Sequence, residues 1–413
     1  MSILEKRNNK IYYWIILFII SISNQLFAQN IIEHFNIQSQ YLKETKIVNV
    51  ALPDQYQFSA KEYPIILILD SNLLFDTTTA IANQLSRTSR MPESIVISFS
   101  AGSRHRNYYA PNLYNNHRDR PYNYGNKQDE LLSFLENELL PQIEQKYRVA
   151  KFKIVVGFSP SSALSIHTLL TMPNLFQAYI CLAAGNIIGD GYSRGKRLIE
   201  ELEKLYGSQK LAQNYLYVVS GSKDAEGQPY IKASVEDFND KLFKYNTSNI
   251  HTKAEIIEGE GHTDVVLPGL ISAFDFIFPK GEWVVDYLDL IEDEGTAKEN
   301  IMEFYNDLSK IYGFQIYPNV DRLYSMSCLK NLGRRLLGTN KTEEAIELFE
   351  LWTTLYPQSH LAYHYLGTSY KENSNLIEAG EAYNKALNLA LAQNSNDTDL
   401  YKKSLESLNQ IKQ

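Results

Sequence analysis

Short apolar runs rich in β-branched residues alternate with amphipathic stretches from Thr45 to Phe278. The runs read "TKIVNVAL", "YPIILILD", "ESIVISFS", "FKIVVGFS", "AYICLAAG", "YLYVVSG" and "KAEIIEGEG", a composition that predicts buried strands. The segments between them include "ELLSFLENELLPQIEQKY", "SALSIHTLLTM" and "VEDFNDKLFKY", whose apolar spacing predicts helices. Strands alternating with helices predict a mainly parallel sheet covered on both faces, so we expect an α/β domain over residues 29–283.

A different period begins after Lys280, where the strand signals end. Leu332-Gly333 recurs as Leu366-Gly367, 34 residues later. The same register pairs Leu329 with Tyr363, Leu336 with Tyr370, Ala345 with Ala379 and Phe349 with Tyr383. This pattern resembles the tetratricopeptide repeat, in which small residues let two helices approach beside an aromatic ring. We expect a helical linker over residues 284–325, and two repeats with a capping helix over residues 326–413 that could hold a protein partner.

The N-terminus carries the pattern of a signal peptide. Lys6, Arg7 and Lys10 precede the apolar run Ile11 to Ile20, and Ala28 is a small residue suited to cleavage before Gln29. We therefore expect residues 1–28 to be removed and the protein to be exported, either periplasmic or secreted. The run is short for a spanning helix, which needs about 20 residues. No stable membrane insertion is expected after cleavage, and an uncleaved anchor is the alternative.

Composition and charge limit the classes of molecule that the protein is expected to bind. The 413 residues are 44% hydrophobic and 21% charged, as in ordinary globular proteins, and the net charge is −8. Removing residues 1–28 takes away three basic residues and Glu5, which leaves 37 − 47, or −10. This acidity argues against nucleic acid as a partner. The two cysteines, Cys181 and Cys328, lie in apolar segments far apart and read as buried thiols without a bridge. His360 and His364 lack further ligand candidates at metal spacing, so they are interpreted as residues of the repeat face and no metal site is expected there.

A candidate nucleophile lies where the run ending in Phe158 meets a helical pattern. Gly157-Phe158-Ser159-Pro160-Ser161 resembles the G-x-S-x-G turn that presents a reactive Ser between strand and helix, with the second Gly replaced. The same residues also suit an ordinary helix start, with Ser at the N-cap and Pro at the first position. Both interpretations predict a strand, a turn and a helix.

Two further residues follow in the order that α/β hydrolases use, which is Ser, acid, His. Asp224 comes directly after the run "YLYVVSG", and Glu226 is an alternative acid. His262 lies in the Gly-rich stretch "EGEGHTD" that leads into an apolar helix, with Asp264 close by. The sequence thus predicts a Ser159, His262 and Asp224 constellation.

Residues 45–280 resemble the esterase family of α/β hydrolases that includes esterase D and the siderophore esterases. The family's Leu-Asp-Gly, Arg-x-Arg-Asp, G-H-S-x-G-G and Gly-x-x-His-Gly-Ser-Val segments correspond here to Leu69-Asp70-Ser71, Arg104-His105-Arg106-Asn107, Gly157-Phe158-Ser159-Pro160-Ser161-Ser162 and Gly259-Glu260-Gly261-His262-Thr263-Asp264-Val265. The resemblance implies an α/β-hydrolase fold followed by an all-α helical-repeat domain. It also implies hydrolysis of a small-molecule carboxylic ester, with Ser159 as nucleophile, His262 as base and Asp224 as its orienting acid, without metal or cofactor.

Departures from the family pattern gather around the nucleophile. Pro160 has no N–H to donate to an oxyanion, so Ser161 or Ser162 is the expected substitute donor. Candidates for the oxyanion site and pocket are Ser71, Ser161, Phe158 and Arg106. The aromatic loop from Arg106 to Gly125 is interpreted either as a substrate lid or as a cover over the sheet. The alternative function is a catalytically impaired esterase fold that binds a ligand or protein through its pocket and repeats.

Overall fold

The computed structural model describes residues 31–100, 106–208, 211, 213–292, 294–322 and 326–411. The expected signal peptide, residues 1–28, lies outside the described residues. Within the described part of the chain, no helix is both long and apolar enough to cross a membrane.

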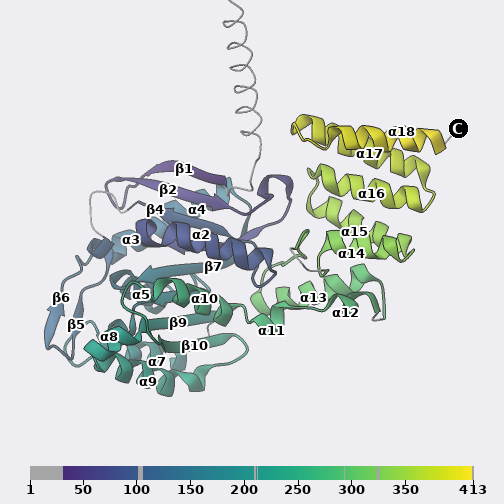
Figure 1. Ribbon diagram of the computed structural model, residues 1–413. Coiled ribbons are helices and arrows are strands. Elements are labelled where there is room, and N and C mark those ends of the chain that lie inside the picture. The colour runs from purple at the N-terminus through teal and green to yellow at the C-terminus, as the bar shows by residue number, and fades with distance from the viewer. Residues whose placement is uncertain are drawn as a thin grey trace, which may run out of the picture.

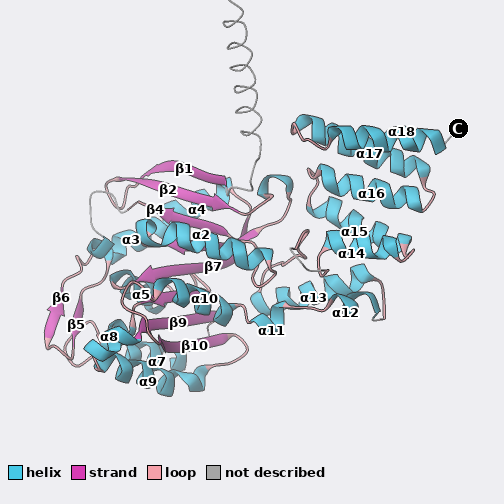
Figure 2. Cartoon of the chain, in the orientation of Figure 1, coloured by secondary structure: helices cyan, strands magenta, loops and turns pink. Residues whose placement is uncertain are grey.

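A mainly parallel sheet forms the centre of the first domain, as predicted (Figures 1 and 2). Its strands are β1 (Ile31–Gln38), β2 (Thr45–Leu52), β3 (Tyr63–Ile68), β4 (Ile95–Phe99), β7 (Val149–Phe158), β8 (Ala178–Leu182), β9 (Asn214–Gly221) and β10 (Ile250–Ile257). They lie in the order β1-β2-β4-β3-β7-β8-β9-β10. The pairs β1–β2 and β2–β4 are antiparallel and the other pairs are parallel. All seven predicted runs form strands, and β1 is an edge strand that the sequence analysis did not identify.

Helices cover both faces of this sheet. They are α2 (Ser71–Arg87), α3 (Gln128–Phe134), α4 (Leu140–Lys146), α5 (Pro160–Thr171), α6 (Gly185–Gly189), α7 (Leu198–Ser208), α8 (Ser222–Gly227), α9 (Tyr230–Leu242) and α10 (Val266–Ile277). A π-helical turn, Leu135–Leu139, joins α3 to α4. Apolar residues of α2 and α10 pack on one face, and those of α3 to α7 and α9 pack on the other. Both cysteines are buried, and no disulfide joins them.

The aromatic loop contains structure that the sequence analysis did not predict. A 3-10 turn spans Arg106–Tyr109, and a small antiparallel hairpin is formed by β5 (Leu113–Asn115) and β6 (Arg120–Tyr122). This hairpin lies at the side of the sheet where the parallel strands end, beside α8 (Figure 1).

The C-terminal region is helical. It comprises α11 (Lys280–Trp283), α12 (Tyr287–Glu292), α13 (Ala297–Tyr312), α14 (Leu329–Gly338), α15 (Thr342–Leu355), α16 (His360–Glu372), α17 (Leu376–Ala392) and α18 (Thr398–Ile411). The expected helical linker is only partly helical, because residues 314–322 after α13 form no helix. At the predicted close approach of α14 and α15, a Cβ added to Gly333 would lie 2.5 Å from the ring of Phe349. The tetratricopeptide-like assignment stays a prediction.

The first of these helices, α11 to α13, pack against the end of the sheet where the parallel strands begin, opposite the hairpin (Figure 1). Phe152 of β7 and Tyr215 of β9 contact Tyr312 of α13, with ring centroids 5.9 and 6.3 Å apart. The apolar core is therefore continuous from one sheet face into the C-terminal helices.

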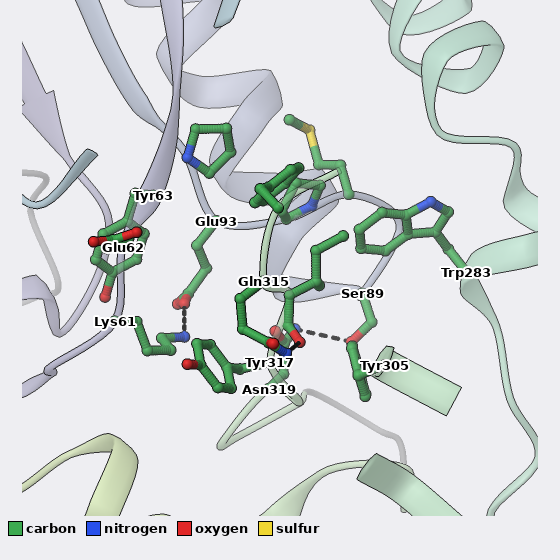
Figure 3. A pocket seen from close by; sticks show the side chains of 15 residues that line it. Lys61, Glu62, Tyr63, Ser89, Glu93, Trp283, Tyr305, Gln315, Tyr317 and Asn319 are labelled. Carbon is green, nitrogen blue, oxygen red and sulfur yellow. Dashed lines mark hydrogen bonds and ion pairs between the residues drawn. The ribbon is translucent and has the colours of Figure 1, made fainter. Parts of the chain in front are cut away.

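A small cavity at this junction is lined by polar side chains from both parts of the chain (Figure 3). Buried Lys61 forms an ion pair with Glu93, and its ammonium lies 4.8 Å from the ring centroid of Tyr356. Asn319 donates to the Ser86 carbonyl at 2.7 Å and to the Ser89 hydroxyl at 2.8 Å. The groups that line the cavity thus bond one another and join the two parts of the molecule.

Candidate active site

Ser159 occupies a sharp turn between β7 and α5. Its backbone has φ 55° and ψ −118°, a left-handed conformation that non-glycine residues rarely adopt. Gly157 permits the turn, because a Cβ there would lie 2.6 Å from the Ser161 carbonyl oxygen. Two backbone bonds hold it: Ser159 N–H donates to Leu182 O at 2.8 Å, and Ser162 N–H donates to Ser159 O at 2.9 Å. The predicted strand, turn and helix are present, and Pro160 does not prevent this backbone conformation.

The Ser159 hydroxyl faces His262 and does not cap α5. Ser159 Oγ lies 3.0 Å from His262 Nε2, and its side chain makes no capping bond to the helix. His262 Nδ1 lies 2.7 Å from Asp224 Oδ2. Asp224 belongs to α8, directly after β9, and His262 lies in the loop between β10 and α10. The structure thus brings together the three residues that the sequence singled out, which lie 103 and 38 positions apart along the chain.

The loops that carry Asp224 and His262 are tied to each other. A Cβ on Gly221 would lie 2.2 Å from the Glu260 carbonyl oxygen, so only glycine allows this approach. Gly259 N–H donates to Ser222 Oγ at 2.9 Å, and Lys223 N–H donates to Glu260 O at 3.0 Å. Glu226, the alternative acid, is exposed, and the His262 bond goes to Asp224.

The four pocket candidates lie in different surroundings. Ser71 Oγ lies 2.8 Å from Ser98 Oγ and accepts a bond from Asn49 at 3.2 Å. Phe158 is buried, and its ring meets that of His262 edge-on at 5.2 Å. Ser161 is also buried, and its hydroxyl donates to Asp70. Arg106 begins the 3-10 turn, and its side chain lies outside the described ones.

The expectation that Ser162 supplies a substitute oxyanion donor is wrong. Its N–H already donates to the Ser159 carbonyl, because the first turn of α5 closes tightly behind Ser159. Its hydroxyl contacts the Gly157 and Leu182 carbonyls, each at 3.0 Å. The Ser161 hydroxyl donates to Asp70, and the Ser161 N–H in the first turn of α5 stays a predicted donor.

Asp70 is a residue of the site to which the sequence analysis assigned no role. It lies between β3 and α2, and its Oδ2 accepts from the Phe158 N–H at 3.1 Å and from the Ser161 hydroxyl. The signal was present in the Leu69-Asp70-Ser71 segment, but sequence alone does not reveal a contact across 88 positions.

The hairpin β5–β6 lies against the region of the acid. Arg118, between its strands, donates to Gln228 Oε1 at 2.8 Å, and Gln228 N–H donates to the Asp224 carbonyl at 2.9 Å. Below the hairpin, fully buried Asp190 accepts from Asn115 Nδ2 at 3.3 Å. Burial raises the pKa of Asp190 to about 7, which the Asn115 bond and the nearby Arg118 charge only partly oppose. No sequence motif marks Asp190.

No cluster of three or more His, Cys, Asp or Glu side chains suited to a metal ion occurs among the described residues. His360 and His364 instead connect α16 to α18. His360 Nδ1 lies 2.7 Å from the Tyr401 hydroxyl, and His364 Nε2 lies 3.2 Å from Ser404 Oγ.

The mainly parallel sheet, its helices on both faces and the turn at Ser159 define an α/β hydrolase in fold. The chain belongs to the family described as Putative esterase, which it matches over residues 39–255.

Solved structures share this fold. An IroE-like serine hydrolase from Shewanella oneidensis is 22% identical with a TM-score of 0.61, and the match covers 77% of this chain and 97% of that one. An uncharacterised protein from Capnocytophaga ochracea is 16% identical with a TM-score of 0.54, and the match covers 92% of this chain and 99% of that one. The second match is long enough to include most of the C-terminal helices. No curated protein matches the chain.

Proposed function

We propose that the protein is a carboxylic-ester hydrolase that acts through an acyl-enzyme on Ser159. One observation carries the proposal: a strained Ser159 whose hydroxyl is within hydrogen-bond distance of His262, which in turn contacts Asp224. Membership of the esterase family supports the same reaction class. No cofactor is needed for this chemistry.

In the first step Ser159 Oγ attacks the ester carbonyl carbon while His262 Nε2 takes the hydroxyl proton. The tetrahedral intermediate collapses, the bond to the alcohol oxygen breaks, and His262 returns the proton to the leaving alcohol. Water then attacks the acyl-enzyme, again with His262 as base, and releases the acid and free Ser159. Asp224 holds the imidazole orientation and stabilises its positive charge through Nδ1.

The oxyanion site is assigned to the turn after β3. In α/β hydrolases one donor is the N–H after the nucleophile, and a second comes from the turn that follows this strand. Pro160 cannot supply the first donor. Ser71 is the first residue of α2, so its N–H has no partner within the helix and is the candidate for the second. Loss of one donor typically costs about 10²- to 10³-fold in rate, so we expect a slow esterase.

The test is hydrolysis of p-nitrophenyl acetate by the chain from Gln29 to Gln413. Ser159→Ala should abolish turnover and labelling by a fluorophosphonate, which reacts with activated serines. Pro160→Leu restores a backbone N–H after the nucleophile and should raise kcat. Ser165→Ala is the matched control, because it removes a buried hydroxyl one turn further along α5. Turnover that persists in Ser159→Ala would contradict the proposal.

A binding protein without turnover is the second candidate, and Pro160 is the observation that favours it. This candidate predicts neither turnover nor labelling in the folded wild-type chain. Labelling without acetate turnover would instead indicate an active nucleophile that needs a different ester. Export through residues 1–28 and a protein partner at residues 326–413 stay predictions.

A further inference from the structure

We propose that Asp70 and Ser161 form a positioning pair that holds the turn after β3 against the nucleophile turn and so fixes the Ser71 N–H as oxyanion donor. The inference rests on the proposed esterase function. It names two residues that touch neither Ser159 Oγ nor His262 in the described contacts, and that act through the backbone around them.

The pair is a buried bridge between two loops. Asp70 and Ser161 are 6% and 4% exposed. Asp70 Oδ2 accepts from the Ser161 hydroxyl and from the Phe158 N–H, and Phe158 N also lies 2.7 Å from Ser161 Oγ. Asp70 is the N-cap residue of α2, yet its side chain makes no capping bond to that helix. The carboxylate is directed across to the nucleophile turn instead.

The bond between Asp70 and Ser161 lies just beyond the point where the backbone pairing of β3 and β7 ends. The last registered pair of β3 and β7 is Ile68 with Val156, followed by the bond from Leu69 N–H to Val156 O at 3.0 Å. Beyond that point the Asp70 side chain continues the connection to Phe158 and Ser161. Hydrogen bonds that a carboxylate accepts are roughly twice as strong as those between neutral groups, so the bonds to Asp70 can hold the short turn after β3 in place.

The backbone N–H groups around Ser159 explain why the bond between Asp70 and Ser161 matters for the oxyanion site. Phe158 N–H is directed to Asp70, Pro160 has no N–H, and Ser162 N–H is used by the Ser159 carbonyl. The bridge therefore bears on both remaining candidates: the N–H of Ser71, which is adjacent to Asp70, and the N–H of Ser161, whose own hydroxyl forms the bridge. The family motif has Gly at the position of Ser161, and Gly has no hydroxyl to give. Pro160 thus removes one oxyanion donor. The next residue, Ser161, adds a hydrogen bond to Asp70 and so holds the turn that carries another candidate donor, the Ser71 N–H.

The experiment compares wild type with Ser161→Ala, Asp70→Asn, Asp70→Ala and the double variant Asp70→Asn/Ser161→Ala. Ser165→Ala serves as control, since it loses a buried hydroxyl of the same helix that bonds only the Ser161 backbone carbonyl, at 3.3 Å, and makes no contact with Asp70. For each variant, kcat and KM for p-nitrophenyl acetate are measured together with the inhibition constant of phenylboronic acid. This probe forms a tetrahedral adduct on the nucleophile and mimics the transition state.

Ser161→Ala should lower kcat by about 10-fold or more, with KM within about twofold, and should weaken boronate inhibition by a similar factor. Asp70→Asn should lose less than Asp70→Ala, because the amide oxygen still accepts a bond. The double variant should lose about as much as its more affected single variant, since the two residues act through one bridge. Ser165→Ala should stay near wild type.

The outcomes separate this inference from the proposed function. A wild-type chain without turnover or labelling overturns both. A wild-type esterase in which Ser161→Ala unfolds at lower temperature but keeps kcat and boronate affinity overturns the inference alone. Additive losses in the double variant also overturn it, because they would show that the residues act separately.

Discussion

Ser159 pairs a strained backbone with an accessible hydroxyl. A non-glycine residue at such dihedral angles costs about 1 to 3 kcal/mol, and the two backbone bonds that flank it offset part of this cost. This backbone conformation directs the Ser159 Oγ away from the capping position of α5 and toward His262. This geometry, more than the residue types, favours the interpretation of Ser159 as a nucleophile over that of an ordinary helix start.

At this scale the two candidate acids can be separated. Asp224→Asn should lower kcat by about 10³- to 10⁴-fold, because the amide cannot hold the imidazole in its working tautomer or stabilise its charge. Glu226→Gln removes an acid two positions away that makes no bond to His262 among the described contacts, and should leave kcat within about twofold. Initial rates on p-nitrophenyl acetate measure both. Equal losses in the two variants would contradict the assignment of the acid.

Asp190 should make stability depend on pH. Its folded pKa of about 7 exceeds the value of about 3.9 expected in the unfolded chain. Between these values the folded state keeps a proton that the unfolded state releases, so stability falls as pH rises through this window. Asp190→Asn removes this contribution. From pH 5 to pH 8, the free energy of unfolding of the variant, measured in urea, should therefore rise by at least about 1 kcal/mol relative to that of wild type. An unchanged difference would show that Asp190 does not retain its proton.

Sequence order was enough to select Ser159, Asp224 and His262 as candidates, and the structure places their side chains in contact. Their catalytic role stays a prediction. Sequence order could not identify Asp70 or Asp190, whose surroundings come from segments far apart in the chain. It also assigned Ser162 wrongly, since whether an N–H is free depends on how tightly the first turn of a helix closes.

At the scale of helices and strands, the sequence predicted the long and regular elements. Seven strands followed from apolar runs, but β1 is an edge strand with mostly exposed side chains, so its pattern is weak. The strands β5 and β6 have three residues each, which is too short to show a period, and β6 contains Pro121. Their pairing depends on tertiary contacts such as the bond from Tyr114 N–H to Gly191 O.

The contact between α14 and α15 gives a prediction for one helix. Gly333→Ala should destabilise the protein by about 1 to 3 kcal/mol, because the new methyl group overlaps the ring of buried Phe349, which stacks on Tyr365. Gly338→Ala at the end of the same helix meets nothing within 4 Å and should be neutral or stabilising. Urea unfolding measures both. If Gly333→Ala were stabilising, the close packing of the two helices would be wrong.

At the scale of the whole molecule, the candidate active site at the ends of β7, β9 and β10 and the C-terminal helices occupy opposite ends of the sheet (Figure 1). The helices contact the starts of β7 and β9 through a cluster of aromatic rings, whereas Ser159, Asp224 and His262 lie where β7, β9 and β10 end. Within the described residues, the helical region therefore supports the sheet without contacting Ser159. A partner bound there would reach the active site only through the sheet.

Stability and catalysis should consequently separate in variants of Tyr312. This buried ring contacts Phe152, Tyr215 and Phe278, and its hydroxyl accepts from Trp283 and donates to the Ile277 carbonyl. Tyr312→Ala should cost about 3 to 5 kcal/mol, and Tyr312→Phe, which keeps the ring, should cost less. Because the core is continuous, tryptophan fluorescence and loss of esterase activity should report one shared unfolding transition. Below that transition kcat should equal that of wild type. Two separate transitions would show that the C-terminal helices fold independently, and a lower kcat in folded Tyr312→Ala would show that the helical region influences the active site across the sheet.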